Sequence, residues 1–137
     1  HGPQGGDEIN IIRPGINYGW PVITYGVNYV IGTKIGEGTH KAGMAQPLYY
    51  WVPSIAPSGL CVYEAELFPA WRGDLLLGAL VDREVRRIDR AGATVAGEVA
   101  LFEDLEARVR DVRVGPDGAL YILLPDRIVR VTPAGGS

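Results

Sequence analysis

The chain of 137 residues is long enough for one ordinary domain with a hydrophobic core, and its 47% hydrophobic and 21% charged residues exclude a disordered chain. A formal charge of −3, with no basic run, argues against a nucleic-acid binder, and no apolar segment has the length of a membrane span. The 19 glycines and 10 prolines are spread along the chain, which indicates frequent turns rather than a low-complexity tract.

The first part of the chain shows no regular alternation of apolar and polar residues. Residues 1–21, HGPQGGDEINIIRPGINYGWP, hold five glycines, three prolines and an adjacent acidic pair, which is typical of a binding loop rather than a helix or a plain strand. Residues 22–59 are rich in glycines and aromatic residues and are too long for a simple hairpin connection. Long loops in compact folds usually carry function, so we expect a functional role here.

From residue 73 onward the sequence predicts a series of β-strands. Residues 73–80 form an apolar run suited to a strand buried on both faces, and residues 83–90 place Val85 and Ile88 among arginines. Further strands are expected at 94–102, around Val112 and Val114, at 119–123 and at 127–133, with a tight Gly-Pro-Asp-Gly turn before residue 119.

Two of these segments repeat each other. GDLLLGALVDREVRRIDRAG and GALYILLPDRIVRVTPAG share an apolar strand, an acidic turn, an arginine-rich alternating strand and a closing Ala-Gly. The offset of about 43 to 45 residues is the size of one four-stranded propeller blade. One blade cannot cover both of its faces, so the repeat predicts neighbouring blades around an axis. Only about three blades fit this length, which predicts a partial propeller.

Two reactive side chains have simple structural interpretations. Cys61 is the single cysteine and lies between Leu60 and Val62, so we expect a buried thiol on a strand. His40 lies in the polar segment GTHKAG with no second histidine or cysteine at ligand spacing, which is typical of a surface histidine. The sequence contains no serine nucleophile elbow, zinc-ligand pattern or phosphate-binding loop.

Several motifs in order resemble those of a known family over essentially the whole chain. These are HGPQGGDEINIIRPGINYGWP, YGVNY, PSIAPSGL, FPAWRGDLLLGAL and RVRDVRVGPDGALYIL. The sequence resembles the C-terminal half of the soluble aldose sugar dehydrogenases, which are grouped with the soluble quinoprotein glucose dehydrogenases as glucose/sorbosone dehydrogenases.

The resemblance implies an all-β fold, namely part of a six-bladed β-propeller of four-stranded antiparallel sheets. Residues 1–58 would hold calcium and cofactor loops with a partial blade, residues 59–107 one blade and residues 108–137 the closing blade. The unusual His-Gly-Pro start is then expected to be sequence from the middle of a longer protein.

The resemblance also implies two calcium sites. In the family, main-chain carbonyls of the Gly-Pro after the histidine hold a calcium ion against the cofactor, which carries over to Gly2 and Pro3 and suits the oxygen preference of calcium. A second, structural calcium uses the residues that match Glu8 and Tyr18, the tyrosine through its main-chain oxygen. Without the resemblance, Asp7 and Glu8 would be interpreted as a solvated acidic turn.

The implied cofactor is pyrroloquinoline quinone (PQQ), a tricarboxylate. Tyr29 matches a tyrosine of the quinone pocket, and Arg108 and Arg110 match two arginines that line it, with Val109 between them. Guanidinium groups pair bidentately with carboxylates, and residues two apart on a strand point the same way. Arg113 is expected to point to the other face. The alternative for such arginines is a solvated sheet face, which describes the segment REVRR better.

Other implied cofactor contacts depart from the family pattern. Relatives place a lysine at the position of Val81, so the segment Ala79, Leu80 and Val81 would supply main-chain and van der Waals contacts without the charge. Trp51 lies one residue out of register with a tryptophan that covers the quinone in some relatives, and plain packing is its alternative. His1 would lie beside the cofactor. Trp20 and Trp71 are expected to pack.

The implied reaction oxidises the anomeric hydroxyl of an aldose sugar to the lactone, with hydride transfer to PQQ and electrons passed to an external acceptor. The catalytic base belongs to the N-terminal half, so we expect this chain alone to be inactive and to associate with itself or with that half. A periplasmic or secreted location is also implied. The alternatives are a non-catalytic propeller module, a calcium-dependent propeller lactonase and an inactive structural fragment.

Overall fold

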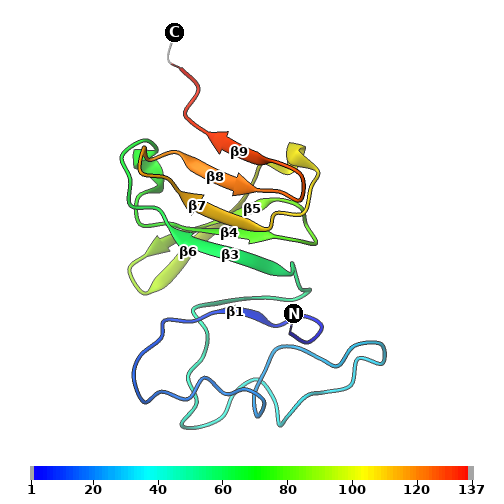
Figure 1. The fold of residues 1–137 in the computed structure, drawn as a ribbon. Helices are drawn as coiled ribbons and strands as arrows, with labels where there is room; N and C mark the ends of the chain where they lie inside the picture. Colours follow the sequence, from blue (N-terminus) through cyan, green and yellow to red (C-terminus); the bar gives the residue numbers. More distant parts are fainter. Residues whose placement is uncertain (1, 136–137) are drawn as a thin grey trace. The chain divides into compact units, whose positions relative to one another are not determined.

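The computed structural model describes residues 2–135, which form an all-β structure in two compact units divided between Ala56 and Pro57 (Figure 1). All strand pairs within its sheets are antiparallel. The described residues contain no α-helix, only the 3₁₀ turns η1 (Pro69–Trp71) and η2 (Glu103–Leu105). Among them, no helix is long and apolar enough to cross a membrane.

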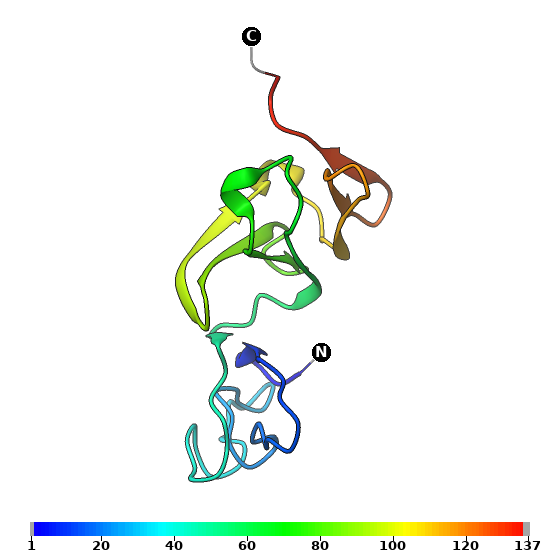
Figure 2. The ribbon, with the colours of Figure 1, turned by 90° about the vertical axis from the view of Figure 1, so that its left-hand side faces the viewer.

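The unit that ends at Ala56 contains little regular structure. Its two strands, β1 (Asp7–Ile9) and β2 (Tyr49–Trp51), pair with each other, and the chain between them follows an irregular course (Figure 2). Isolated bridges join Val27 to Gln4 and to Lys34. The rings of Tyr25 and Tyr50 stack with centroids 3.7 Å apart. This unit is therefore held by turns, isolated bridges and ring stacking rather than by an extended sheet.

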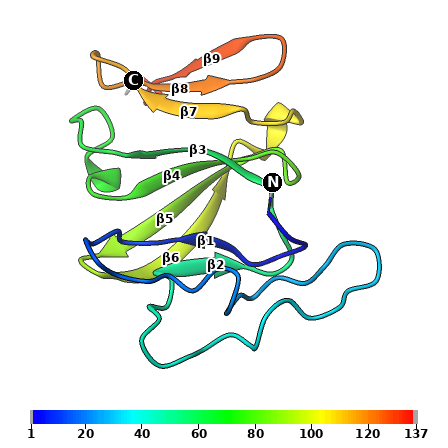
Figure 3. The same ribbon diagram turned by 60° about the horizontal axis from the view of Figure 1, so that its bottom comes forward.

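The unit from Pro57 onward begins with a four-stranded sheet in the order β3-β4-β5-β6 (Figure 3). Its strands are β3 (Pro57–Val62), β4 (Leu75–Ala79), β5 (Val85–Ala91) and β6 (Thr94–Leu101). Strand β4 lies inside the sheet, and all five of its residues are buried. This confirms the prediction of a strand buried on both faces.

A three-stranded sheet follows, in the order β7-β8-β9. Its strands are β7 (Asp111–Val114), β8 (Leu120–Leu123) and β9 (Ile128–Val131). Between β7 and β8, Gly118 adopts the left-handed φ of 78° and donates its N–H to the carbonyl of Gly115 at 2.9 Å. The predicted Gly-Pro-Asp-Gly turn is therefore confirmed.

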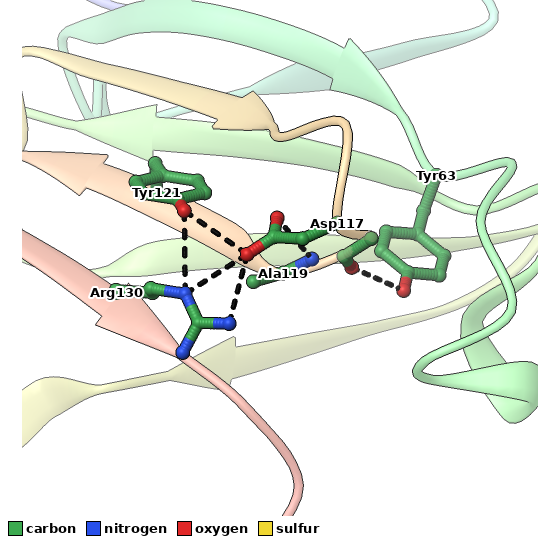
Figure 4. A network of polar contacts seen from close by, with 6 residues as sticks. Tyr63, Asp117, Ala119, Tyr121 and Arg130 are labelled. Atoms are coloured by element: carbon green, nitrogen blue, oxygen red, sulfur yellow. Dashed lines mark hydrogen bonds and ion pairs between the residues drawn. The ribbon is translucent and has the colours of Figure 1, made fainter.

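The main hydrophobic core is made by side chains of both sheets of this unit. Each fully buried aliphatic side chain contributes about 1.5–3 kcal/mol relative to exposure, before entropy costs. The fully buried members are Tyr63, Leu76, Val85, Val109, Val112, Leu120 and Ile122. The phenol of Tyr63 donates a hydrogen bond to the carbonyl of Gly118 at 2.7 Å (Figure 4). It also accepts one from the N–H of Phe68 at 3.0 Å. A buried polar group is thus satisfied within the core.

The predicted strands at 73–80, 83–90 and 94–102 are confirmed as β4, β5 and β6, and those at 119–123 and 127–133 as β8 and β9. The expectation of four strands per sheet holds for β3–β6 but not for the other two sheets, which have three strands and two. Residues 22–48 lack the alternation that a further sheet requires. The alternative interpretation of Asp7 and Glu8 as a solvated acidic turn does not hold, because both lie half-buried on β1. The proposed division of the chain at 58/59 and 107/108 stays a prediction.

Candidate functional site

The four residues predicted to bind calcium gather around one cavity in the unit that ends at Ala56. The cavity has a volume of about 380 Å³. Its lining consists of Gly2, Pro3, Gly6, Glu8, Tyr18, Trp20, Ile23 and Thr24. Loop segments far apart in this part of the sequence therefore meet where the resemblance placed metal ligands.

Close main-chain packing builds this cavity. A Cβ atom at Gly6 would lie 2.4 Å from the main-chain nitrogen of Gly26, and Gly6 has a left-handed φ of 75°. Only glycine tolerates both conditions. The N–H of Gly6 also donates to the carbonyl of Trp51 at 2.7 Å, which ties the loop after Pro3 to β2. Gly6 is thus a structural requirement of the cavity wall.

The polar atoms near Glu8 fit a hard cation. The Glu8 carboxylate accepts a hydrogen bond from the side-chain amide of Asn10 at 3.1 Å, while Oδ1 of Asn10 and Oδ2 of Asp7 are buried without a hydrogen-bond partner. Buried oxygens normally have partners, and calcium binds carboxylate and carbonyl oxygens. Sequence reasoning did not select Asn10, which directly follows β1.

The phenol of Tyr18 already makes two hydrogen bonds. The hydroxyl donates to the carbonyl of Ile11 and accepts from the N–H of Arg13, both at 2.7 Å. A cation here would therefore meet the main-chain oxygen of Tyr18, as the resemblance implies. The described residues contain no group of three or more His, Cys, Asp or Glu side chains placed to hold a metal, so any cation would depend largely on neutral oxygens.

The predicted cofactor segments 79–81 and 108–110 lie side by side in the unit from Pro57 onward. The N–H of Val109 donates to the carbonyl of Ala79 at 3.3 Å, and the N–H of Arg110 donates to the carbonyl of Leu123 at 2.7 Å. Val109 is fully buried, whereas Arg108 and Arg110 on either side of it are exposed. The alternation expected from the sequence is therefore present, and both guanidinium groups are open to solvent.

One detail of that expectation is wrong: Arg108, Val109 and Arg110 precede β7 and belong to no strand. Their alternation comes from the two main-chain hydrogen bonds and the buried Val109 side chain. Within the described part of the chain, the side chains of Arg108 and Arg110 make no hydrogen bond or ion pair. By contrast, Arg113 pairs with Asp111 at 3.1 Å and donates to the carbonyl of Leu60 at 3.3 Å.

The turn that carries Val81 is fixed by one arginine that sequence reasoning assigned to a solvated face. Arg86 contacts the carboxylates of Asp82 at 2.6 Å, Glu84 at 2.5 Å and Glu98 at 3.0 Å. Glu84 is buried, and burial raises the pKa of its carboxyl despite the opposing charge of Arg86. The Val81 side chain is 59% exposed, whereas Ala79 and Leu80 are buried, so only Val81 offers a side chain to a ligand.

The aromatic residues proposed for the cofactor lie in different surroundings. Tyr29 is 58% exposed, in a turn where the Asn28 amide donates to Thr33 Oγ1 at 3.0 Å. Trp51 is 7% exposed and meets the Tyr49 ring edge to face. The packing expected for Trp20 is wrong, because Trp20 is 62% exposed and lines the cavity. Sequence alone had no signal for that exposure.

The remaining single residues behave as follows. Trp71 packs as expected, stacked on Phe68 with centroids 4.3 Å apart. His40 is exposed, as predicted, with Nδ1 2.8 Å from Thr39 Oγ1. Cys61 lies on β3 but is only half-buried, and burial raises the pKa of its thiol to about 11, so the thiol stays protonated at neutral pH. His1 lies outside the described residues.

Comparison with known proteins gives concordant matches. The family model Glucose / Sorbosone dehydrogenase matches residues 1–130. The aldose sugar dehydrogenase YliI of Escherichia coli is 45% identical over 97% of this chain. The apo-form crystal structure of the soluble aldose sugar dehydrogenase from Escherichia coli superimposes with a TM-score of 0.89 at 44% identity, over 98% of this chain and 40% of that one.

A more distant structure contains the cofactor. The PQQ-bound aldose sugar dehydrogenase from Streptomyces coelicolor matches 87% of this chain and 31% of its own, with a TM-score of 0.59 and 26% identity. The chain spans 37% of the length of the Escherichia coli relative YliI. Because the family model covers nearly all of the sequence, the chain belongs to the glucose/sorbosone dehydrogenase family.

Proposed function

We propose that this chain is the C-terminal portion of a PQQ-dependent aldose dehydrogenase. The whole protein would oxidise the anomeric hydroxyl of an aldose sugar to the lactone, with hydride transfer to the quinone and electrons passed to an external acceptor. Family membership and the PQQ-bound structure of a distant relative support this proposal. The two sheets from Pro57 onward would be consecutive blades of a six-bladed propeller, and a periplasmic or secreted location is part of the proposal.

The observation that carries the proposal is the pair of unpaired guanidinium groups at Arg108 and Arg110. Within residues 2–135, the arginines without an ion-pair partner are Arg13, Arg83, Arg90, Arg108 and Arg110. Of these, Arg108 and Arg110 stand on both sides of one residue, the anchored and buried Val109. Two neighbouring guanidinium forks suit a ligand with several carboxylates, which PQQ is.

Other residues of the chain would orient the cofactor. Val81 would contact it through its exposed side chain, and Tyr29, Trp51 and His1 remain proposed contacts from the family resemblance. The cavity residues would hold calcium, with the carbonyls of Gly2 and Pro3 for one ion and Glu8 with the Tyr18 carbonyl for a second. When bound, PQQ would supply the hydride acceptor, and a calcium ion would supply Lewis-acid chemistry.

By the family resemblance, the catalytic base would belong to the remainder of the protein, outside this chain. We therefore expect the isolated chain not to oxidise sugars. One observation favours a second function, a propeller module that binds without catalysis: Val81 cannot supply the positive charge that relatives place there. The carboxylate contacts would then depend on Arg108 and Arg110 alone.

The test uses the full-length protein with PQQ and calcium, and follows the quinone absorbance after addition of glucose or xylose. Reduction of the quinone supports the dehydrogenase. Binding of PQQ without reduction by any aldose would indicate the binding module instead. Hydrolysis of a lactone without PQQ would identify a lactonase and overturn the proposal.

A further inference from the structure

Strand β3 contains an irregularity directly opposite the arginine segment. Its register with β4 pairs Pro57 with Ala79 and Leu60 with Leu77, so that Ser58 and Gly59 together face Gly78. Two residues opposite one form a β-bulge, which bends the strand and re-aims a side chain. The re-aimed side chain here is that of Ser58.

The Ser58 hydroxyl donates a hydrogen bond to the carbonyl of Val109 at 2.7 Å. The N–H of Val109 donates to the carbonyl of Ala79 at 3.3 Å, and the Val109 side chain is fully buried. Val109 is therefore held at its carbonyl, its amide and its side chain. Because the two neighbouring residues are Arg108 and Arg110, the main-chain positions from which both side chains start depend on this anchor.

The glycines around Ser58 allow the close approach. A Cβ atom at Gly78 would lie 2.5 Å from Ser58 Oγ and 2.7 Å from Val109 Cγ1. A Cβ atom at Gly59 would lie 1.6 Å from Oδ1 of Asp111, the first residue of β7. Real Cβ contacts are not so short, so both positions require glycine if the segment is to pack on β3 and β4. The bulge, the two glycines and the Ser58 hydroxyl together form the packing site of Val109.

We propose that Ser58 is a positioning residue for the cofactor: its hydroxyl fixes the main chain between Arg108 and Arg110 so that both guanidinium groups face the carboxylates of one ligand. The inference rests on the proposed binding of PQQ and adds the residue that pre-organises it. Ser58 touches no ligand itself. Loss of its hydrogen bond lets the segment move, and binding must then order the arginines.

The first test measures the anchor without any cofactor. In the full-length protein we expect Ser58→Ala to accelerate amide hydrogen exchange at Val109 by about five- to ten-fold, the effect of losing one neutral hydrogen bond. The matched control is Thr94→Val. Thr94 also donates its hydroxyl to a main-chain carbonyl, that of Ala91 at 2.9 Å, but at the β5–β6 turn. The control should leave exchange at Val109 unchanged, and unchanged exchange in Ser58→Ala would overturn the inference whether or not PQQ binds.

The second test is a binding cycle with PQQ. Ser58→Ala should weaken the affinity by about three- to ten-fold, whereas in the Arg108→Gln/Arg110→Gln background the same change should weaken it less than about two-fold. An equal loss in both backgrounds would mean that Ser58 acts on structure generally and would overturn the positioning role. If the wild-type protein fails to bind PQQ, the proposed function fails, while faster exchange at Val109 would still support the anchor.

Discussion

The two units of the chain reach a defined structure by different physical means. The unit from Pro57 onward has seven strands and a fully buried core, and its segment 108–110 is held by main-chain hydrogen bonds to β4 and to Leu123. The unit that ends at Ala56 has two short strands, glycine turns and buried oxygens without partners. Strand pairing and apolar burial thus define the unit from Pro57 onward, whereas turns and main-chain contacts define the unit that ends at Ala56.

The largest expected effect tests whether the sheets depend on their core. Leu120→Ala removes a fully buried side chain of β8 and should lower the free energy of unfolding by about 2–5 kcal/mol, through lost burial and a residual cavity. Urea unfolding of the full-length protein measures it. A cost below about 1 kcal/mol would show that this core is loosely packed.

A smaller loss of stability is expected when the buried hydroxyl of Tyr63 is removed. Tyr63→Phe leaves the carbonyl of Gly118 and the N–H of Phe68 without their partner, and should cost about 1–3 kcal/mol in the same unfolding measurement. Tyr121→Phe is the matched control, because its hydroxyl is exposed beside Asp117. Equal costs for the two variants would contradict the role of Tyr63 as an internal link.

Calcium should stabilise the unit with the unsatisfied oxygens. At a calcium concentration ten times the dissociation constant, binding to the folded state adds about 1.4 kcal/mol to the free energy of unfolding. Glu8→Gln should reduce or abolish that gain, which the calcium dependence of Tm in the full-length protein measures. Glu37→Gln, in the same unit but paired with Lys41, should keep the gain. A gain of the same size in Glu8→Gln would contradict the proposed role of Glu8.

The smallest effect is expected at the exposed turn between β7 and β8. Hydrogen bonds from Arg130, and further ones from the N–H of Ala119 and from Tyr121, lower the pKa of Asp117 (Figure 4). A carboxyl whose pKa is lower in the folded state than in the unfolded state stabilises the folded protein at pH values above the unfolded pKa. That stabilisation is lost as the pH falls through the folded pKa. The Tm difference between wild type and Asp117→Asn should therefore shrink as pH falls below about 4. A difference independent of pH would refute the assigned cause.

Much of the strand unit could be predicted from sequence because its signals are local. The apolar run at 75–79 and the Gly-Pro-Asp-Gly turn each specify their own conformation. The two repeated segments correspond to the paired strands β4 with β5 and β8 with β9. The sequence predicts a strand around Cys61 but not its start at Pro57, because Pro57 and Gly59 have low strand propensity. Ser58 and Gly59 form the bulge, whose partner Val109 is distant in sequence.

The candidate site could be predicted only through resemblance. An Arg-Val-Arg sequence does not reveal whether the arginines have partners, and Arg86 in a similar segment contacts three carboxylates. The orphaned oxygens of Asp7 and Asn10 likewise depend on loop packing around Gly6 and Gly26, which no periodicity encodes. Long-range main-chain contacts determine both sites.

The most direct test of the central claim is equilibrium binding of PQQ to the full-length protein. We expect Arg108→Gln/Arg110→Gln to weaken the affinity by about a hundred-fold or more, because each substitution removes one charge-assisted pair between a guanidinium group and a PQQ carboxylate. Arg72→Gln/Arg127→Gln removes the same charge from arginines that already have acidic partners, and should leave the affinity within about three-fold of wild type. Equal affinity of the Arg108/Arg110 variant and the wild-type protein would contradict the claim that these two guanidinium groups hold the cofactor.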